Sequence, residues 1–321
     1  MKSVLPFFLL CGCAQQQGAP QAPQGQSRTP KPPVSQTKPG KTPPPVYSAG
    51  DHPETLKEDK VDRTYIVHVP KEYDGKHPIP VVMLLHGWTG SAKTVQVHTG
   101  MAAEADKDGF VLVAPDGLGK PQGWNCGFLN IGGEGADDVK FLTDVLDEVG
   151  KKVKVDPKRI FVAGHSNGAM MSYVLGSKLS ARIAAIGVVA GTIGFDQGPQ
   201  QARVDAPAHP ISALIIHGLL DPTVPYDHGE GLLQNCYSAP ASAAFWAKAD
   251  GIVGPPTVKS TAKGNIEERI WRSGRIEVEL ITIGNGTHDW PGGVNWDGPE
   301  TKTGLDAAER LWGFFKHHPK A

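Results

Sequence analysis

One serine in the sequence lies in a setting where its hydroxyl can act as a nucleophile. The pentapeptide GHSNG occupies residues 164–168, after a strand-like apolar run at 160–163 and before a helical pattern that starts at Ala169. On a tight strand-to-helix turn the serine Oγ is raised clear of the backbone, and flanking glycines avoid clashes with the neighbouring strand and helix. The pattern predicts that Ser166 is a nucleophile. The alternative is an inert serine on a glycine-rich turn.

A serine nucleophile needs a histidine to take its proton and a carboxylate to fix the tautomer of that histidine. After a turn of this type the acid comes first in the chain and the histidine second. Asp221 follows the apolar run at 214–216, and His288 lies in a glycine-rich loop after the apolar run at 278–283. We therefore expect Asp221 to be the acid and His288 the base.

Other residues compete for these two roles on residue type alone. Asp289 is adjacent to His288, which makes an orienting contact between the two side chains awkward. His86 and His217 each precede a glycine at the end of a strand, where we expect a structural role in shaping the turn. The remaining competitors are the acids Asp227 and Asp250 and the bases His165 and His228. No H-E-x-x-H or other paired metal-ligand spacing is present, so we do not expect a metal.

Acyl transfer also needs backbone N–H donors where the tetrahedral oxyanion forms. One donor is expected from Asn167, directly after the nucleophile. The second is expected from the loop HGWTGS at 86–91, with Trp88 as the first choice and Thr89 as the alternative.

Three tryptophans, Trp88, Trp124 and Trp290, lie on loops at the ends of strands. Aromatic faces suit sugar rings, aryl acids and apolar chains. We therefore expect Trp124, Trp290 and His165 to contact the substrate. For any single tryptophan, packing for stability is the alternative.

Apolar periodicity shows which elements position these residues. Continuous apolar runs are typical of strands buried on both faces, and residues 64–69 alternate like an edge strand. Strands alternating with helices predict an α/β fold, with a mostly parallel sheet and helices on both faces, in one domain over residues 52–318. Residues 192–210 form a loop that can serve as a small cap. The buried runs lie at 81–85, 110–114, 160–163, 183–189, 214–216 and 278–283, and helical patterns at 91–106, 137–149, 168–179, 239–250 and 304–315.

The N-terminal 51 residues differ in composition from the rest. Residues 1–13 form a short apolar segment ending in Leu10-Cys11-Gly12-Cys13, which is similar to an export signal with a lipobox and predicts lipidation at Cys13. An ordinary secretory signal is the alternative. Residues 14–51 are rich in Pro and Gln and are expected to form an unfolded linker from the membrane to the domain. In an oxidising compartment Cys126 and Cys236 can pair, so a disulfide between them is one expectation and two free thiols the other.

The chain of 321 residues has 32 Lys and Arg against 33 Asp and Glu, a net charge of −1. This balance gives no electrostatic reason to expect nucleic acid as a partner. We expect a monomer whose partners are an ester substrate and the membrane of the cell envelope, with secretion as the alternative location.

Several short motifs in a fixed order extend the argument beyond the serine turn. The sequence resembles the polyhydroxybutyrate depolymerase and feruloyl esterase family of α/β-hydrolase esterases. The resemblance runs from about residue 60 to residue 315. The motifs are LHG at 85–87, PDG at 115–117, WN at 124–125, DD at 137–138, GHSNGAMM at 164–171, HGLLDPTVPY at 217–226 and HDWPGG at 288–293.

The resemblance implies a cofactor-free, exported serine esterase with Ser166, Asp221 and His288 as its triad. Its substrates would be feruloyl, acetyl or short polyester esters. No separate polymer-binding segment is recognisable, so soluble oligomers or cell-wall esters are expected rather than solid polyester. The alternatives are a serine peptidase or acyltransferase on the same fold, or a non-catalytic surface lipoprotein that binds glycan.

Overall fold

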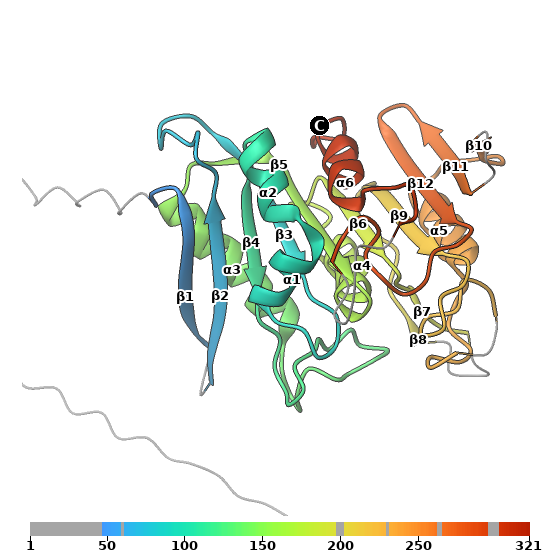
Figure 1. Cartoon of the computed structure of the whole chain (residues 1–321), viewed down its shortest axis with the longest axis horizontal. Coiled ribbons are helices and arrows are strands. Elements are labelled where there is room, and N and C mark those ends of the chain that lie inside the picture. Colours follow the sequence, from blue (N-terminus) through green and yellow to red (C-terminus); the bar gives the residue numbers. More distant parts are fainter. Residues whose placement is uncertain (1–46, 59–60, 197–201, 229–230, 262–264, 295–301) are drawn as a thin grey trace, which may run out of the picture. The chain divides into compact units, whose positions relative to one another are not determined.

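One large mixed sheet forms the centre of the structure (Figure 1). The structure is a computed structural model, and it describes residues 47–58, 61–196, 202–228, 231–261, 265–294 and 302–321. The central strands of the sheet, β4, β3, β5, β6, β9 and β12, run parallel to one another, and antiparallel strands flank them on both sides. The order across the sheet is β1 (Gly50–Glu58), β2 (Val61–Val69), β4 (Val111–Pro115), β3 (Ile79–Leu85), β5 (Val155–His165), β6 (Ala185–Val189), β9 (Ser212–Gly218), β12 (Ile276–Ile283), β11 (Ile266–Ser273) and β10 (Thr257–Ser260).

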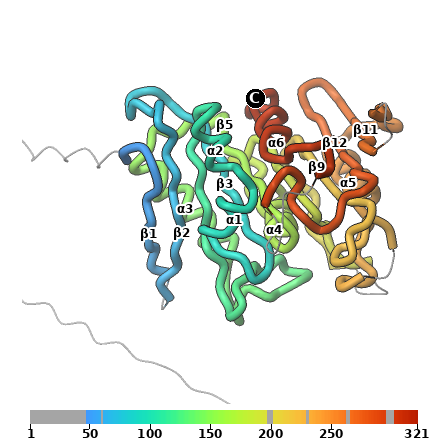
Figure 2. The backbone as a smooth tube through the Cα atoms, viewed as in Figure 1, coloured from blue at the N-terminus to red at the C-terminus, as the bar shows by residue number. Residues whose placement is uncertain are grey.

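Helices cover both faces of this sheet. Successive side chains of β3 belong to two different apolar clusters, since Val81 and Met83 pack on one face and Val82 and Leu84 on the other. The first cluster contains α3 (Asp138–Lys152), α4 (Asn167–Lys178) and α5 (Ala239–Ala249). The second contains α1 (Ala92–Thr99), α2 (Met101–Asp108) and α6 (Ala307–Phe315), which Figure 2 shows in front of the sheet. The expected α/β fold with helices on both faces is therefore confirmed.

The strands buried on both faces were the easiest to predict. Every residue of β3, β4, β6 and β9 is buried, as their continuous apolar runs indicate. The helix α3 likewise begins as expected, because Asp137 caps it by accepting a hydrogen bond from the Lys140 N–H at 2.9 Å.

The edge of the sheet differs from the prediction. The strand β2 is not an edge strand, because β1 pairs with it over its whole length and takes the outer position. β1 begins at Gly50, two residues before the expected start of the domain. Its sequence GDHPETLKE has no apolar run, and Pro53 is tolerated in a strand that needs partners on one side only.

Other elements are divided or were not predicted. The helical pattern expected over 91–106 forms two helices, because Gly100 adopts a left-handed φ of 71° between α1 and α2. The expected cap loop contains the short antiparallel pair β7 (Gly194–Phe195) and β8 (Ala202–Arg203). None of the helices in the described ranges has the length and apolar character needed to cross a bilayer.

The disulfide expected between Cys126 and Cys236 is not formed, and both residues are buried free thiols. Their sulfurs have different neighbours. Cys126 Sγ lies 3.6 Å from Asn167 Nδ2, whereas the Cys236 thiol bonds to Thr192. Burial raises the pKa of both thiols, that of Cys236 to about 11, so both stay protonated at neutral pH. Cys13, the signal at 1–13 and nearly all of the linker at 14–51 lie outside the described residues.

Candidate active site

The turn that carries Ser166 joins β5 to α4. Ser166 has a left-handed φ of 54°, and its N–H is held by the Val189 carbonyl at 2.9 Å. The flanking glycines are required by close backbone packing. A Cβ on Gly164 would lie 2.3 Å from Gly168 C, and a Cβ on Gly168 would lie 2.3 Å from Leu85 O. The steric reason for the two glycines, predicted from the pentapeptide, is therefore confirmed.

The structure brings Ser166, His288 and Asp221 into one hydrogen-bonded chain. His288 Nε2 lies 2.9 Å from Ser166 Oγ, and His288 Nδ1 lies 2.8 Å from Asp221 Oδ2. Asp221 follows β9 and His288 follows β12, so both loops leave the sheet at the carboxyl ends of parallel strands, beside the turn after β5. With Nδ1 donating to the carboxylate, Nε2 is free to accept the serine proton.

Asp221 is held in place from several sides. Its Oδ1 accepts hydrogen bonds from the N–H groups of Thr223 and Val224, at 2.8 and 2.9 Å. On the other oxygen, His217 Nε2 lies 3.4 Å from Asp221 Oδ2. Burial alone would raise the pKa of Asp221, but hydrogen bonds from His217 and His288 outweigh it and lower the pKa below its usual range. The acid therefore stays ionised and can stabilise a charged His288.

The competing histidines have structural contacts. His217 is almost fully buried and donates from Nε2 to the Val224 carbonyl at 2.8 Å, and His86 accepts the Gly117 N–H at 2.9 Å. The predicted structural role of both residues in shaping turns is confirmed.

The side chain of His165, which we expected to contact the substrate, is bonded to the loop that carries His288. Its Nε2 bonds to the His288 carbonyl oxygen at 2.6 Å, so the side chain supports the backbone of the histidine loop. Burial, reinforced by the proximity of His288, lowers the pKa of His165 to about 4. His165 is therefore neutral at physiological pH and donates this hydrogen bond.

Two backbone amides are candidates for the oxyanion hole. Asn167 is the first residue of α4, and neither its N–H nor that of Trp88 has a protein acceptor in the described part of the chain. The Thr89 N–H is already used, since it donates to the Gln122 carbonyl at 2.9 Å. Trp88 is therefore a better candidate than Thr89 for the second oxyanion donor, and the helix N-terminus favours the charge that develops there.

Two of the three loop tryptophans are buried, which corrects their expected role in contacting the substrate. Trp124 is 0% exposed and donates from Nε1 to the His86 carbonyl at 2.8 Å. Trp290 is 5% exposed and packs edge-on against His165. Of these three tryptophans, Trp88 alone has an exposed side chain, with 49% of the residue accessible to solvent. A loop tryptophan has no periodicity that would tell an inward from an outward side chain.

Sequence reasoning missed the side chain of Asn167. Its Oδ1 accepts the Trp124 N–H at 2.7 Å, and its Nδ2 donates to the Trp124 carbonyl at 3.2 Å. This residue therefore joins the nucleophile turn to the loop over residues 117–137. The sequence signal was present, since Asn167 and the WN pair at 124–125 are both among the family motifs.

In the described ranges, no group of three or more His, Cys, Asp or Glu side chains is placed to hold a metal ion. The assembled groups are those of nucleophilic acyl transfer.

The sheet order, the strained serine turn and the order Ser, Asp, His along the chain define the α/β-hydrolase fold. Residues 136–241 match the family model described as Phospholipase/Carboxylesterase. The chain therefore has the fold of the α/β-hydrolases and is similar to carboxylesterases, with feruloyl esterases among its relatives.

Two curated relatives and one solved structure illustrate this relationship. Feruloyl esterase B of Piromyces equi is 32% identical over 247 residues, which cover 73% of this chain and 44% of that protein. A probable feruloyl esterase C of Aspergillus niger is 30% identical over 181 residues, 54% of this chain and 60% of that protein. The chain thus spans about half the length of these relatives. The acetyl xylan esterase from Aspergillus awamori shares the fold, with a TM-score of 0.61 at 17% identity over 84% of this chain and 100% of that one.

Proposed function

We propose that the protein is a serine esterase that hydrolyses feruloyl or acetyl esters of cell-wall polysaccharide through an acyl-enzyme on Ser166. The observation that carries the proposal is the position of His288, within hydrogen-bond distance of both Ser166 Oγ and Asp221 Oδ2. The substrate class is supported by the relatives, which include feruloyl esterases.

The proposed reaction has two stages. Ser166 Oγ attacks the ester carbonyl carbon while His288 Nε2 takes the hydroxyl proton, and the N–H groups of Trp88 and Asn167 stabilise the oxyanion. The intermediate then expels the alcohol, which receives the proton from His288, and leaves the acyl group on Ser166. Water, deprotonated by His288, attacks the carbonyl carbon of this second ester, and the intermediate releases the acid as Ser166 Oγ takes the proton back from His288. Asp221 stabilises the imidazolium in both stages.

We further propose that the protein works in the cell envelope, with Cys13 as the lipidated first residue of the mature chain. The support is the apolar segment ending in Leu10-Cys11-Gly12-Cys13 and the Pro-rich stretch that follows it. The full-length protein should fractionate with membranes, and Cys13→Ala should move it to the soluble fraction. Equal membrane retention of both proteins would refute the lipid anchor.

Hydrolysis of a matched substrate panel tests the proposed activity. The panel contains p-nitrophenyl acetate, methyl ferulate, acetylated xylan and hydroxybutyrate oligomers, each assayed with the native protein and with Ser166→Ala. We expect turnover by the native protein and a loss of at least about a thousandfold in the variant, since the variant lacks the nucleophile. Comparable turnover by the folded variant would exclude Ser166 as the nucleophile. A best rate on hydroxybutyrate oligomers would replace the cell-wall substrate with a polyester one.

A further inference from the structure

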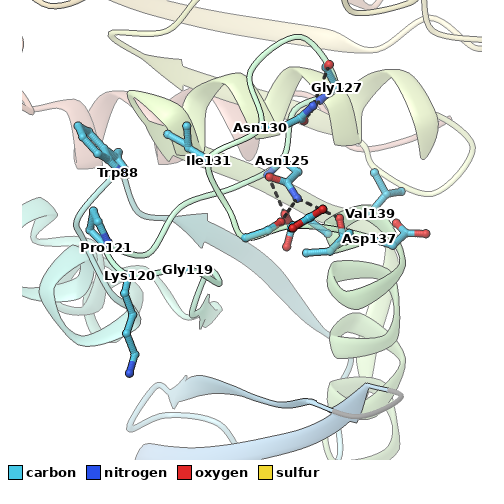
Figure 3. A pocket seen from close by; sticks show the side chains of 15 residues that line it. Trp88, Gly119, Lys120, Pro121, Asn125, Gly127, Asn130, Ile131, Asp137 and Val139 are labelled. Atoms are coloured by element: carbon cyan, nitrogen blue, oxygen red, sulfur yellow. Dashed lines mark hydrogen bonds between the residues drawn. The ribbon is translucent and has the colours of Figure 1, made fainter.

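A groove of about 960 Å³ lies between Trp88 and the loop over residues 117–137 (Figure 3). One end of the groove adjoins the reaction centre, because Trp88 follows Gly87, where an added Cβ would lie only 3.2 Å from Ser166 Cβ. From Trp88 the groove extends to the start of α3 at Asp137 and Val139.

The walls of this groove are held rigidly. Asn125 donates from Nδ2 to the carbonyls of Gly133 and Ala136, at 2.8 and 3.2 Å, and accepts the Gly132 N–H at 2.8 Å. Below it, the Asn125 N–H donates to Asp138 Oδ2 at 2.7 Å. A groove whose shape is fixed before binding loses little conformational entropy when a ligand enters.

The chemistry of the lining changes along the groove. At the end next to the serine, the half-exposed indole of Trp88 stands with the apolar side chains of Pro121 and Ile131. Towards α3, the lining includes the exposed carboxylates of Glu134 and Asp137. An ionised carboxylate only accepts hydrogen bonds, so it selects ligands that carry donors.

This arrangement discriminates between the two substrate classes that the family resemblance left open. A sugar ring has an apolar face that can stack on an indole and hydroxyl groups that can donate to carboxylates. A polyester chain offers carbonyl acceptors along its length and a hydroxyl donor only at its end. The groove therefore matches the sugar.

We propose that the groove between Trp88 and Asp137 binds the sugar chain on the alcohol side of the ester, with Trp88 stacking on one ring and Glu134 accepting hydrogen bonds from hydroxyl groups further along. The ligand is a neutral oligosaccharide that carries the scissile acyl group. This inference rests on the proposed esterase function and deepens it.

The test compares two substrates with the same acyl group, an acetylated xylo-oligosaccharide and p-nitrophenyl acetate, on the full chain. Trp88→Ala removes the indole and keeps the backbone N–H, and Glu134→Ala removes one carboxylate. We expect each change to lower kcat/KM for the oligosaccharide by about tenfold more than for p-nitrophenyl acetate, mainly through KM. Trp88→Phe should restore most of the preference, because it restores an aromatic face.

Glu72→Ala is the matched control. Glu72 follows β2, which runs antiparallel to β4, so it lies at the edge of the sheet opposite to the active site. The variant Glu72→Ala should leave unchanged the ratio of kcat/KM for the oligosaccharide to kcat/KM for p-nitrophenyl acetate. Equal losses on both substrates in Trp88→Ala and Glu134→Ala, or no loss on either, would overturn the sugar site while leaving the esterase intact. Failure of the native protein to hydrolyse p-nitrophenyl acetate would instead refute the proposed function itself.

Discussion

A buried carboxyl group outside the active site gives a prediction whose size follows from the structure. Asp250 caps the C-terminal end of α5, where the helix dipole disfavours a negative charge. Its Oδ1 accepts the Ile211 N–H at 3.1 Å, whereas its buried Oδ2 has no partner in the described residues. Burial raises the pKa of Asp250 from 3.8 to about 7.

A pKa that is higher in the folded than in the unfolded chain lowers stability as pH rises. Well below pH 3.8 Asp250 is protonated in both states, and its effect on the free energy of unfolding is absent. Between pH 4 and pH 8 the carboxyl group ionises more readily in the unfolded chain than in the folded one. The free energy of unfolding therefore falls by about 4 kcal/mol over this range. Asp250→Asn removes the titration and keeps an acceptor for the Ile211 N–H.

Urea unfolding of native protein and Asp250→Asn at pH 4 and pH 8 measures this effect. We expect the stability of the variant relative to the native protein to be about 4 kcal/mol greater at pH 8 than at pH 4, and any constant cost of the asparagine cancels in this difference. Asp62→Asn, at an exposed position in β2, is the control and should change stability by less than about 0.5 kcal/mol at either pH. A difference between Asp250→Asn and native protein that is independent of pH would refute the reasoning.

Two further predictions concern the loops that carry the acid and the base. Gly218→Ala should destabilise the protein by more than about 2 kcal/mol and lower kcat, because its Cβ would lie 2.4 Å from the Gly286 backbone. Gly150→Ala in α3, where a Cβ meets nothing within 4 Å, should instead raise the free energy of unfolding by about 0.5–1 kcal/mol; urea unfolding that ranks the two variants the other way would contradict the steric argument. His165→Phe, which loses the bond to the His288 carbonyl, should lower kcat by about tenfold or more, whereas His165→Gln should retain more of it. Because the pKa of His165 is about 4, the pH profile of His165→Gln should keep the native acid limb between pH 5 and pH 8; a shifted limb would show that His165 titrates in the reaction.

The parts of the fold that were predictable are those whose sequence pattern has a single physical explanation. A fully apolar run such as β3 must be covered on both faces, and the glycines beside Ser166 are needed because backbone from β3 and α4 lies within 2.3 Å of their missing side chains. Asp221 and His288 could be predicted as acid and base from their order along the chain, since both follow buried parallel strands.

The parts that were not predictable depend on contacts with distant segments. β1 has alternating half-buried and exposed residues that resemble a polar linker, and only its pairing with β2 defines it as a strand. The burial of Trp124 depends on the His86 carbonyl, which is 38 positions away in the sequence. Sequence spacing left the pairing of Cys126 with Cys236 open, because only the fold determines which neighbours each sulfur meets.

The double hydrogen bond between Asn167 and Trp124 sets a limit on how this enzyme can be redesigned. Asn167, the residue proposed to donate its backbone N–H to the oxyanion, also fixes the base of the loop that lines the groove. Replacing the whole loop over residues 117–137 to change selectivity would therefore disturb the nucleophile turn as well. Such a replacement should keep the Trp124-Asn125 pair, so that Trp124 can still bond to Asn167. Libraries of variants confined to other residues that line the groove, such as Lys120 and Glu134, separate selectivity from turnover and are the better starting point for engineering.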